Sequence, residues 1–308
     1  DAGTEDNITI NIINSSNAGT INVDNIETVN LVSTDSPTDD ANELTIVAAG
    51  SGDATEVLNI SGAGDTEATA NSALTVNNSA SGDVELTASS ATTVNHTGTG
   101  SLDITSAADA TITASGTGAL ELTDTAGETT VTGSSGDDTF DFQGNLEEDD
   151  TIVGGTGTDT LVILGDATGG AAAGDLSVSG VETLEIDSDT AADDLDFDVF
   201  ANPSEITSVV VDSLLDGDAV TLTDTQASTF TINNAETGNT ADDFLALTID
   251  LKDASGETDT VTIDLNNTQT GEGNNTNDLV ITTITANAIE TINLDTSIVS
   301  DEGSAEII

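Results

Sequence analysis

The chain has no cysteine, methionine, tryptophan or tyrosine, and only one of its 308 residues is Lys or Arg. Without cysteine, disulfides and thiolate metal sites are excluded. No apolar run approaches the ~18 residues that a membrane-spanning helix needs, so we expect no membrane insertion. The sequence has no basic signal peptide and no initiating methionine, and we therefore expect a processed product or a fragment of a longer protein.

Positive charge is almost missing, whereas Asp and Glu number 58, so the formal net charge is −57. Such a chain cannot displace the counterions of nucleic-acid phosphates, and anionic lipid would repel it. Carboxylates at this density also repel one another unless salt screens them or cations bridge them. We therefore expect an extracellular setting rich in cations, with either millimolar calcium or brine.

Aromatic residues make up only 2% of the chain, as six Phe, and the hydrophobic fraction of 35% is mostly Ala, Val, Ile and Leu. These residues can fill thin layers between β-strands but not a thick aromatic core. High charge with few aromatics is also the signature of disorder. The regular spacing of the apolar residues argues against disorder and for an all-β fold.

Short apolar pairs alternate with polar residues between residues 74 and 132, which is the period-2 pattern of strands with one buried face. The last three pairs follow one another at steps of 18 residues, and Val94 and Ile112 keep the same step between them. Gly, Ser, Asn and Asp, the residues of tight turns, separate the strands. The pairs are Leu74/Val76, Val84/Leu86, Leu102/Ile104 and Leu120/Leu122.

A fixed short period of strand and turn is typical of a parallel β-solenoid, in which each coil stacks its apolar residues on the next coil about 4.8 Å away. An antiparallel sandwich would also space its strands by roughly 8–12 residues, but it gives no reason for an 18-residue repeat. We predict a solenoid over residues 1–132, with looser spacing at Leu44–Ile46 and Leu58–Ile60.

Downstream, we predict a calcium-binding unit over residues 133–190 and a further β-strand domain over residues 191–308, with a boundary signal at Pro203. Leu161–Leu164 is a continuous apolar run, as in a strand buried on both faces. Asp193–Phe200 is the best helix candidate, but its alternating pattern favours a strand. Further strands are expected at Val209–Val211, Val220–Leu222, Phe230–Ile232, Leu247–Ile249, Val261–Ile263 and Ile292–Leu294.

One six-residue phrase recurs, with the pattern apolar-Glu-Thr-apolar-polar-apolar. Its copies are Ile26–Leu31, Val181–Ile186 and Ile289–Leu294. Three copies predict one structural unit that is used three times. The alternative is that a favoured strand composition repeats by chance.

Residues 154–162, GGTGTDTLV, match the calcium-binding nonapeptide G-G-x-G-x-D-x-U-x at every specified position. Glycines allow a tight turn with inward carbonyls, the Asp supplies a carboxylate, and the large apolar residue anchors the next strand. A weaker copy, GSSGDDTFD at residues 133–141, has Ser134 in place of the second Gly. The copies start 21 residues apart, and the acidic insert EEDD at residues 147–150 lies between them. An ordinary Gly-Asp turn is the alternative for both.

The order of GSSGDDTFDF, DDTIVGGTGTDTLVI and VSGVETLEI over residues 133–186 resembles calcium-binding bacterial surface proteins of the RTX type. The likeness is greatest to surface-layer proteins and to related giant adhesins exported by type I secretion. It implies that calcium folds the exported chain and links subunits into a lattice on the cell surface. Asp149 and Asp150 are candidates for additional calcium ligands, with a solvated acidic loop as the alternative. Carried over residue by residue, the resemblance implies calcium turns at Gly133, Gly136, Asp138, Gly154, Gly155, Gly157 and Asp159.

Catalytic candidates are few, and we expect no enzyme. His96 is the sole histidine and has no nucleophile motif around it. Carboxylate pairs are too common in this chain to indicate glycoside hydrolysis. We expect Lys252 to be a surface residue. Asp194, Asp196 and Asp198 share one face of a predicted strand, where they either hold cations or are merely solvated.

These features together predict a calcium-dependent surface-layer protein outside the cell. Its expected partners are further copies of the chain, in a lattice or a filament, and cell-surface polysaccharide reached through a part outside this sequence. A calcium-stabilised adhesin or biofilm-matrix filament subunit is one alternative. An acidic envelope protein of a halophile is another, in which acidity serves solubility in brine.

Overall fold

The computed structural model describes residues 6–13, 19–23, 26–34, 42–47, 56–142, 144–164, 174–187, 192–212, 219–234, 243–252, 259–267, 279–287, 289–298 and 305–307. Their regular structure is β-strand, apart from two single-turn 3-10 helices, η1 (Phe197–Val199) and η2 (Pro203–Glu205). None of the described helices is long and apolar enough to span a membrane. The chain forms two compact units, one of Asp1–Asn145 with Asp149–Asp159 and one of Leu146–Glu148 with Thr160–Ile308.

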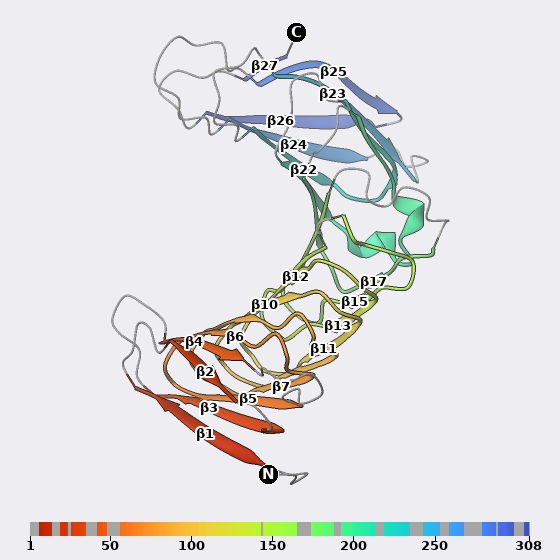
Figure 1. Cartoon of the computed structure of the whole chain (residues 1–308). Helices are drawn as coiled ribbons and strands as arrows, with labels where there is room; N and C mark the ends of the chain where they lie inside the picture. The colour runs from red at the N-terminus through yellow and green to blue at the C-terminus, as the bar shows by residue number, and fades with distance from the viewer. Residues whose placement is uncertain are drawn as a thin grey trace. The chain divides into compact units, whose positions relative to one another are not determined.

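In the first unit the chain alternates between two parallel sheets, so that each strand pairs with the strand two places along the sequence (Figure 1). This is the parallel β-solenoid that the spacing predicts. One sheet contains β1 (Asn7–Ile12), β3 (Thr28–Ser33), β5 (Val57–Gly62), β7 (Thr75–Asn78), β9 (Thr93–His96), β11 (Ala110–Ala114), β13 (Thr129–Thr132) and β15 (Thr151–Val153). The other contains β2 (Thr20–Asn22), β4 (Asn42–Val47), β6 (Thr66–Thr69), β8 (Val84–Thr87), β10 (Leu102–Ser106), β12 (Leu120–Asp124) and β14 (Thr139–Asp141).

The register of the sheets confirms the 18-residue period. Val84 pairs with Leu102 and Leu102 with Leu120, while Val94 pairs with Ile112. Leu74 departs from the expectation, because it precedes β7 and its side chain is 40% exposed. The carbonyl of Leu74 instead accepts the backbone N–H of Thr92 in the next coil.

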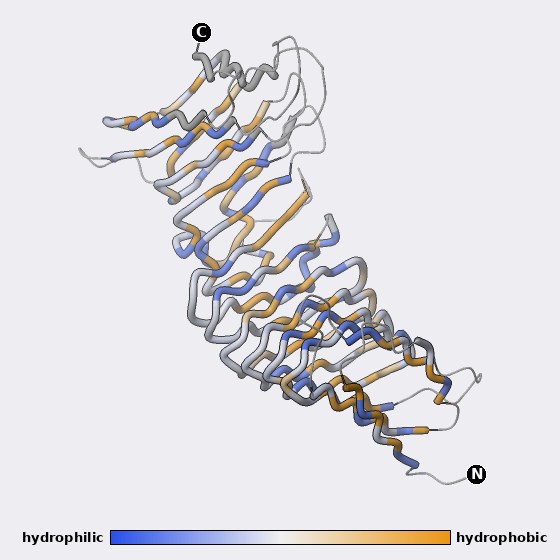
Figure 2. Tube along the Cα trace, turned by 90° about the vertical axis from the view of Figure 1, so that its left-hand side faces the viewer, coloured by the Kyte–Doolittle hydropathy of each residue, from blue (hydrophilic) through white to orange (hydrophobic). Residues whose placement is uncertain are grey.

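The core of the first unit consists of stacked rows of buried side chains, and each row takes one residue from each strand of a sheet. Because the chain alternates inward and outward, orange and blue segments alternate along the strands in Figure 2. Each fully buried Val, Leu or Ile of such a stack contributes about 1.5–3 kcal/mol. One inward row, with no exposed area at any position, consists of Leu58, Val76, Val94, Ile112, Val131 and Ile152.

The turns between coils stack as closely as the strands do. A Cβ atom on Gly116 would lie 1.9 Å from the carbonyl oxygen of Gly98, one coil below. The spacing of the coils therefore selects glycine at this turn. On the outer face, the side-chain amides of Asn59, Asn77 and Asn95 each donate to the Asn one coil below, at 2.9 Å.

The second unit repeats the parallel stacking, where the sequence indicated strands without their arrangement. One sheet has the order β16 (Thr160–Leu164), β18 (Thr183–Asp187), β20 (Ser208–Asp212), β22 (Thr229–Asn234), β24 (Thr260–Asn267) and β26 (Thr291–Ile298). The other has the order β19 (Ala192–Asp196), β21 (Ala219–Thr225), β23 (Asp243–Leu251), β25 (Leu279–Asn287) and β27 (Ala305–Ile307), and β17 is Ser177–Ser179. The three-part division at residues 132 and 190 stays a prediction.

One local expectation in the second unit is confirmed, and another is correct in part. In β16, Leu161, Val162 and Ile163 are all buried, as expected for a strand covered on both faces. Residues 193–200, which suggested either a helix or a strand, contain a piece of each, because β19 ends at Asp196 and the 3-10 helix η1 follows directly.

The recurring Glu-Thr phrase has the same place in all three copies, with its Thr as the first residue of β3, β18 or β26. In two copies the Glu side chain reaches the preceding coil. Glu27 Oε2 accepts the backbone N–H of Asp6 at 2.8 Å, and Glu290 Oε2 accepts that of Asp259 at 3.0 Å. The phrase is thus a strand start that ties one coil to the coil before it.

Candidate cation-binding sites

The glycine turns of the two motifs, residues 133–138 and 154–159, lie on neighbouring coils of the first unit and stack on each other. A Cβ on Gly133 would lie 2.0 Å from the Gly154 oxygen, and one on Gly157 would lie 2.3 Å from the Gly136 oxygen. Gly157, with φ of 147°, also has a backbone conformation that favours glycine. The 21-residue offset does not disturb the stacking, because the extra length lies in the connection at residues 142–150 between β14 and β15.

The motif carboxylates hold backbone groups of adjacent coils. Asp138 is 1% exposed, and its Oδ1 accepts the N–H of Leu120 at 2.6 Å and the hydroxyl of Ser134 at 2.9 Å. Its Oδ2 accepts the N–H of Ser134 at 2.6 Å. Asp159, fully buried, accepts the N–H of Asp138 through Oδ1 at 2.8 Å. These bonds give the motif a structural role, and calcium ligation by its residues stays a prediction.

The two candidate ligands in the acidic insert face different surroundings. Asp149 is exposed at the surface. Asp150 is only 2% exposed, and its Oδ1 accepts the backbone N–H of Thr129 at 2.8 Å. Asp150 therefore belongs to the interior of the coil, whereas Asp149 is solvated.

Asp124 lies beside Asp150 in the interior and was not singled out by the sequence. Its carboxylate is fully buried, and neither oxygen accepts a hydrogen bond of good geometry. Burial, followed by the charge of Asp150, raises the pKa of Asp124 to about 6. The amides of Ala126 and Thr125 and the Thr129 hydroxyl lie close enough to oppose part of this rise. An anion here is therefore poorly compensated by protein groups.

A row of carboxylates runs across the outer face of one sheet in the first unit. Its members are register partners on successive strands, about 4.8 Å apart. Partial burial and the neighbouring row members raise the pKa of Glu67 and of Asp103. We call these five residues the carboxylate row: Glu43, Glu67, Glu85, Asp103 and Glu121.

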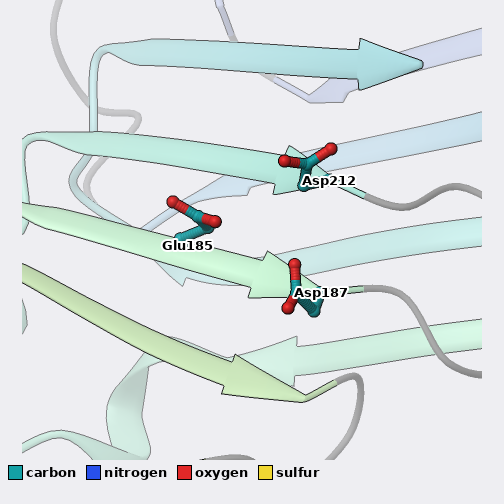
Figure 3. Close-up of side chains that lie close together, drawn as sticks. All are labelled: Glu185, Asp187 and Asp212. Carbon is teal, nitrogen blue, oxygen red and sulfur yellow. The ribbon is translucent and has the colours of Figure 1, made fainter. Parts of the chain in front are cut away.

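Two further acidic clusters lie in the second unit, and each is close enough to hold a metal ion. In the first, Glu185 and Asp187 of β18 lie beside Asp212 of β20 (Figure 3). One oxygen from each lies within 4.8 Å of the others. Asp187 and Asp212 are register partners, which brings them together across 25 residues of sequence.

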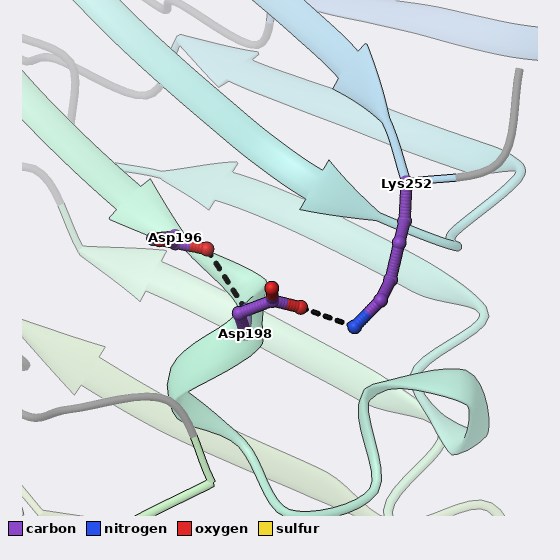
Figure 4. A network of polar contacts seen from close by, with 3 residues as sticks. All are labelled: Asp196, Asp198 and Lys252. Atoms are coloured by element: carbon purple, nitrogen blue, oxygen red, sulfur yellow. Dashed lines mark hydrogen bonds and ion pairs between the residues drawn. The ribbon is translucent and has the colours of Figure 1, made fainter.

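The second cluster consists of Asp196, Asp198 and Asp224, again with one oxygen of each within 4.8 Å of the others. Figure 4 shows that the Nζ of Lys252 donates to Asp198, while the backbone N–H of Asp198 donates to Asp196. Burial and the charges of Asp198 and Asp196 raise the pKa of Asp224. Since Lys252 is the only Lys or Arg of the chain, one cationic charge is already supplied here.

The predicted acidic face is therefore correct in part. Asp196 and Asp198 come together, but with Asp224 from another strand, and the cluster does not include Asp194. Lys252 is a surface residue, as expected, with 42% of its side chain exposed.

His96 is a core residue of β9 without exposed area. Asn78 accepts the N–H of Ala80 through Oδ1, so its amide group faces His96 Nδ1 at 3.1 Å and favours the Nε2–H tautomer. Burial lowers the pKa of His96, against the opposing effects of the Asp138 charge and of the Gly100 and Gly118 carbonyls. The ring is therefore neutral at pH 7.

No protein-family model, no curated protein sequence and no solved structure matches this chain. The resemblance to calcium-binding surface proteins accordingly rests on the glycine motifs and the residues around them.

Proposed function

We propose that this chain is a structural part of a bacterial surface layer, in which calcium bridges the carboxylates of stacked coils and of neighbouring copies. The protein then acts by assembly and not by turnover. Its partners are further copies of itself, with cell-surface polysaccharide bound through another part of the assembly.

The carboxylate row is the observation that carries this proposal. At about 4.8 Å, two unit charges repel by about 1 kcal/mol in water and by more near a protein surface. The chain has 58 acidic residues and a single Lys or Arg, so it cannot neutralise the row itself. Calcium takes six to eight oxygen ligands from flexible carboxylates, which suits both the row and the clusters around Asp187 and Asp198.

The glycine motifs support the choice of calcium. Residues 154–162 fit the calcium nonapeptide at every specified position, with positive φ at Gly155 and Gly157, and the weaker copy at residues 133–141 stacks on them. The resemblance to exported surface-layer proteins adds the extracellular setting and the lattice.

One observation favours a second candidate, an acidic envelope protein of brine. The Asp138 carboxylate already accepts three hydrogen bonds, and Asp159 accepts the N–H of Asp138. Donors of the chain itself therefore already serve these carboxylates, which reduces the need for an ion there. In this case sodium at high concentration screens the charge, and calcium is incidental.

A calcium titration of the whole chain, from chelator to several millimolar, tests the proposal. Circular dichroism and light scattering are followed together, with magnesium as the control and with a parallel series in molar sodium chloride. We expect calcium, but not magnesium, to raise scattering at low salt, because it bridges carboxylates of separate copies.

Electron microscopy of the scattering samples separates the remaining possibilities. Flat sheets support the surface-layer role, and fibres support a filament or adhesin stalk. The proposal is abandoned if chelation leaves both β-structure and assembly unchanged at low salt. If molar sodium chloride stabilises the chain in chelator and calcium adds nothing further, the result supports the acidic envelope protein of brine.

A further inference from the structure

One inward row of the first unit changes from apolar to acidic along the solenoid. At successive steps of 18 residues it contains Ala70, Ala88, Ser106 and Asp124. All four side chains are buried, and Ser106 is the register partner of Asp124. A position that alanine fills in two coils therefore carries a hydroxyl in the third and a carboxylate in the fourth.

The polar atoms around Asp124 lack partners of good geometry. Both carboxylate oxygens of Asp124, the hydroxyl of Ser106 and the hydroxyl of Thr129 are buried, and none of them makes a hydrogen bond of good geometry, although the Thr129 hydroxyl lies near the carboxylate. Thr129 begins the next strand, and its backbone N–H donates to Asp150, whose charge acts on Asp124. Buried polar atoms are nearly always satisfied in proteins, and unsatisfied ones that converge point to an absent ion or water.

We propose that these four residues form an internal metal site, with carboxylate ligands from Asp124 and Asp150, hydroxyl ligands from Ser106 and Thr129, and calcium as the ion. The donors are all oxygen, and two of them carry negative charge, which is the donor set of a hard divalent cation. Water alone would satisfy the hydroxyls but would leave the charge of Asp124 next to that of Asp150 in the interior.

An ion can reach this site from the side of the coil. Residues 125–128 connect Asp124 to Thr129, and all four are exposed. The inference goes beyond the surface-layer role, because an ion inside the coil stabilises one molecule and bridges no second copy. The carboxylate row lies on the outer face of the same strand, so the two kinds of site can be altered separately.

Asp124→Ala tests the site, because it restores the residue found at the equivalent position of two earlier coils. The matched control is Glu56→Gln, which removes an exposed carboxylate of the same unit outside the carboxylate row and the glycine motifs. Calcium bound to each whole chain is measured by equilibrium dialysis, and thermal unfolding is followed in chelator and in calcium. We expect Asp124→Ala to bind one calcium fewer than the control.

In chelator, the melting temperature of Asp124→Ala should exceed that of the wild type, because an uncompensated buried charge has been removed. The rise of its melting temperature on addition of calcium should be smaller than that of Glu56→Gln. The proposal is overturned if Asp124→Ala binds as much calcium as the control, or if it is less stable than the wild type in chelator. Should Asp124→Ala fail to fold, Asp124→Ser, which repeats Ser106, is judged by the same two measurements. If either Asp124 variant scatters light in calcium as strongly as the wild type, loss of this internal site leaves assembly intact, and the two roles are separate.

Discussion

At the scale of single residues, acidic side chains in this chain act as acceptors for the backbone of a neighbouring coil. Asp65 Oδ1 accepts the N–H of Asp83 at 3.0 Å, and Asp83 Oδ1 accepts that of Ser101 at 2.8 Å. Asp138 and Asp159 do the same within the glycine motifs. Charge-assisted bonds of this kind are stronger than neutral ones. Part of the acidity is therefore used to hold the turns of the solenoid.

His96 provides a prediction at the same scale. Its pKa in the folded protein is lowered by burial, so the unfolded chain binds a proton more readily below pH ~6.5. The stability contributed by the neutral ring is complete above that pH and is lost as the pH falls below it.

His96→Asn repeats the residue found one coil earlier, Asn78, and removes the titrating group. Between pH 7.5 and 5, the wild type should lose stability relative to this variant, as measured by urea unfolding in chelator at constant ionic strength. Equal losses in both proteins would show that His96 does not contribute to the pH dependence.

At the scale of the strand, inward and outward positions should differ sharply in their effect on stability. Ile104 is fully buried in β10, whereas the adjacent Thr105 faces outward. We expect Ile104→Ala to lower the free energy of unfolding by about 2–5 kcal/mol, because it leaves a cavity within the stack. Thr105→Ala should change it by less than about 0.5 kcal/mol. Denaturant titration of both variants measures the difference. Similar losses in the free energy of unfolding would contradict the inward orientation of Ile104.

The strands that sequence analysis located best are those with a constant period. Between Val84 and Leu122 each apolar pair recurs at the same step, so both the strands and their register follow from spacing. In the second unit the strands were found but their stacking was not. Register partners there are separated by coils of unequal length, 25 residues for Thr183 and Ser208 but 33 for Asn233 and Asn266.

How far each candidate site could be predicted also depended on whether its residues follow the constant 18-residue period. Four of the five members of the carboxylate row recur in the sequence at the 18-residue step, so their alignment could be predicted from spacing alone, whereas Glu43 lies outside that step. The burial of Asp124 could be predicted only from its inward row, because Ala88 and Ala70 stand at the equivalent positions two and three coils earlier. The cluster of Glu185, Asp187 and Asp212 depends on pairing between strands joined by an irregular coil, which no local pattern indicates.

At the scale of the whole molecule, a net charge of −57 opposes folding through self-repulsion. In chelator, the stability of the wild type should therefore increase between low salt and molar sodium chloride. Glu85→Lys places a cation between Glu67 and Asp103 in the carboxylate row and should stabilise the protein at low salt by up to about 1 kcal/mol.

This gain should shrink in molar salt, because the interactions of exposed charges are screened there. Glu128→Lys, at an exposed turn outside the row, is the control for the change in net charge. Thermal unfolding across a salt series measures the stabilisation that each of the two variants gains. If the two variants gain equally, the effect belongs to the total charge and not to the row.

The constant register of the first unit makes its length adjustable in discrete steps. Removal of one period, such as residues 84–101, would place Thr66 beside Leu102 and Glu67 beside Asp103, with every inward and outward row still continuous. Each added or lost period changes the stack by about 4.8 Å, whereas a single inserted residue within a strand turns its interior face outward. Duplication and deletion of whole periods can therefore tune the reach of such a protein without any redesign of its interior.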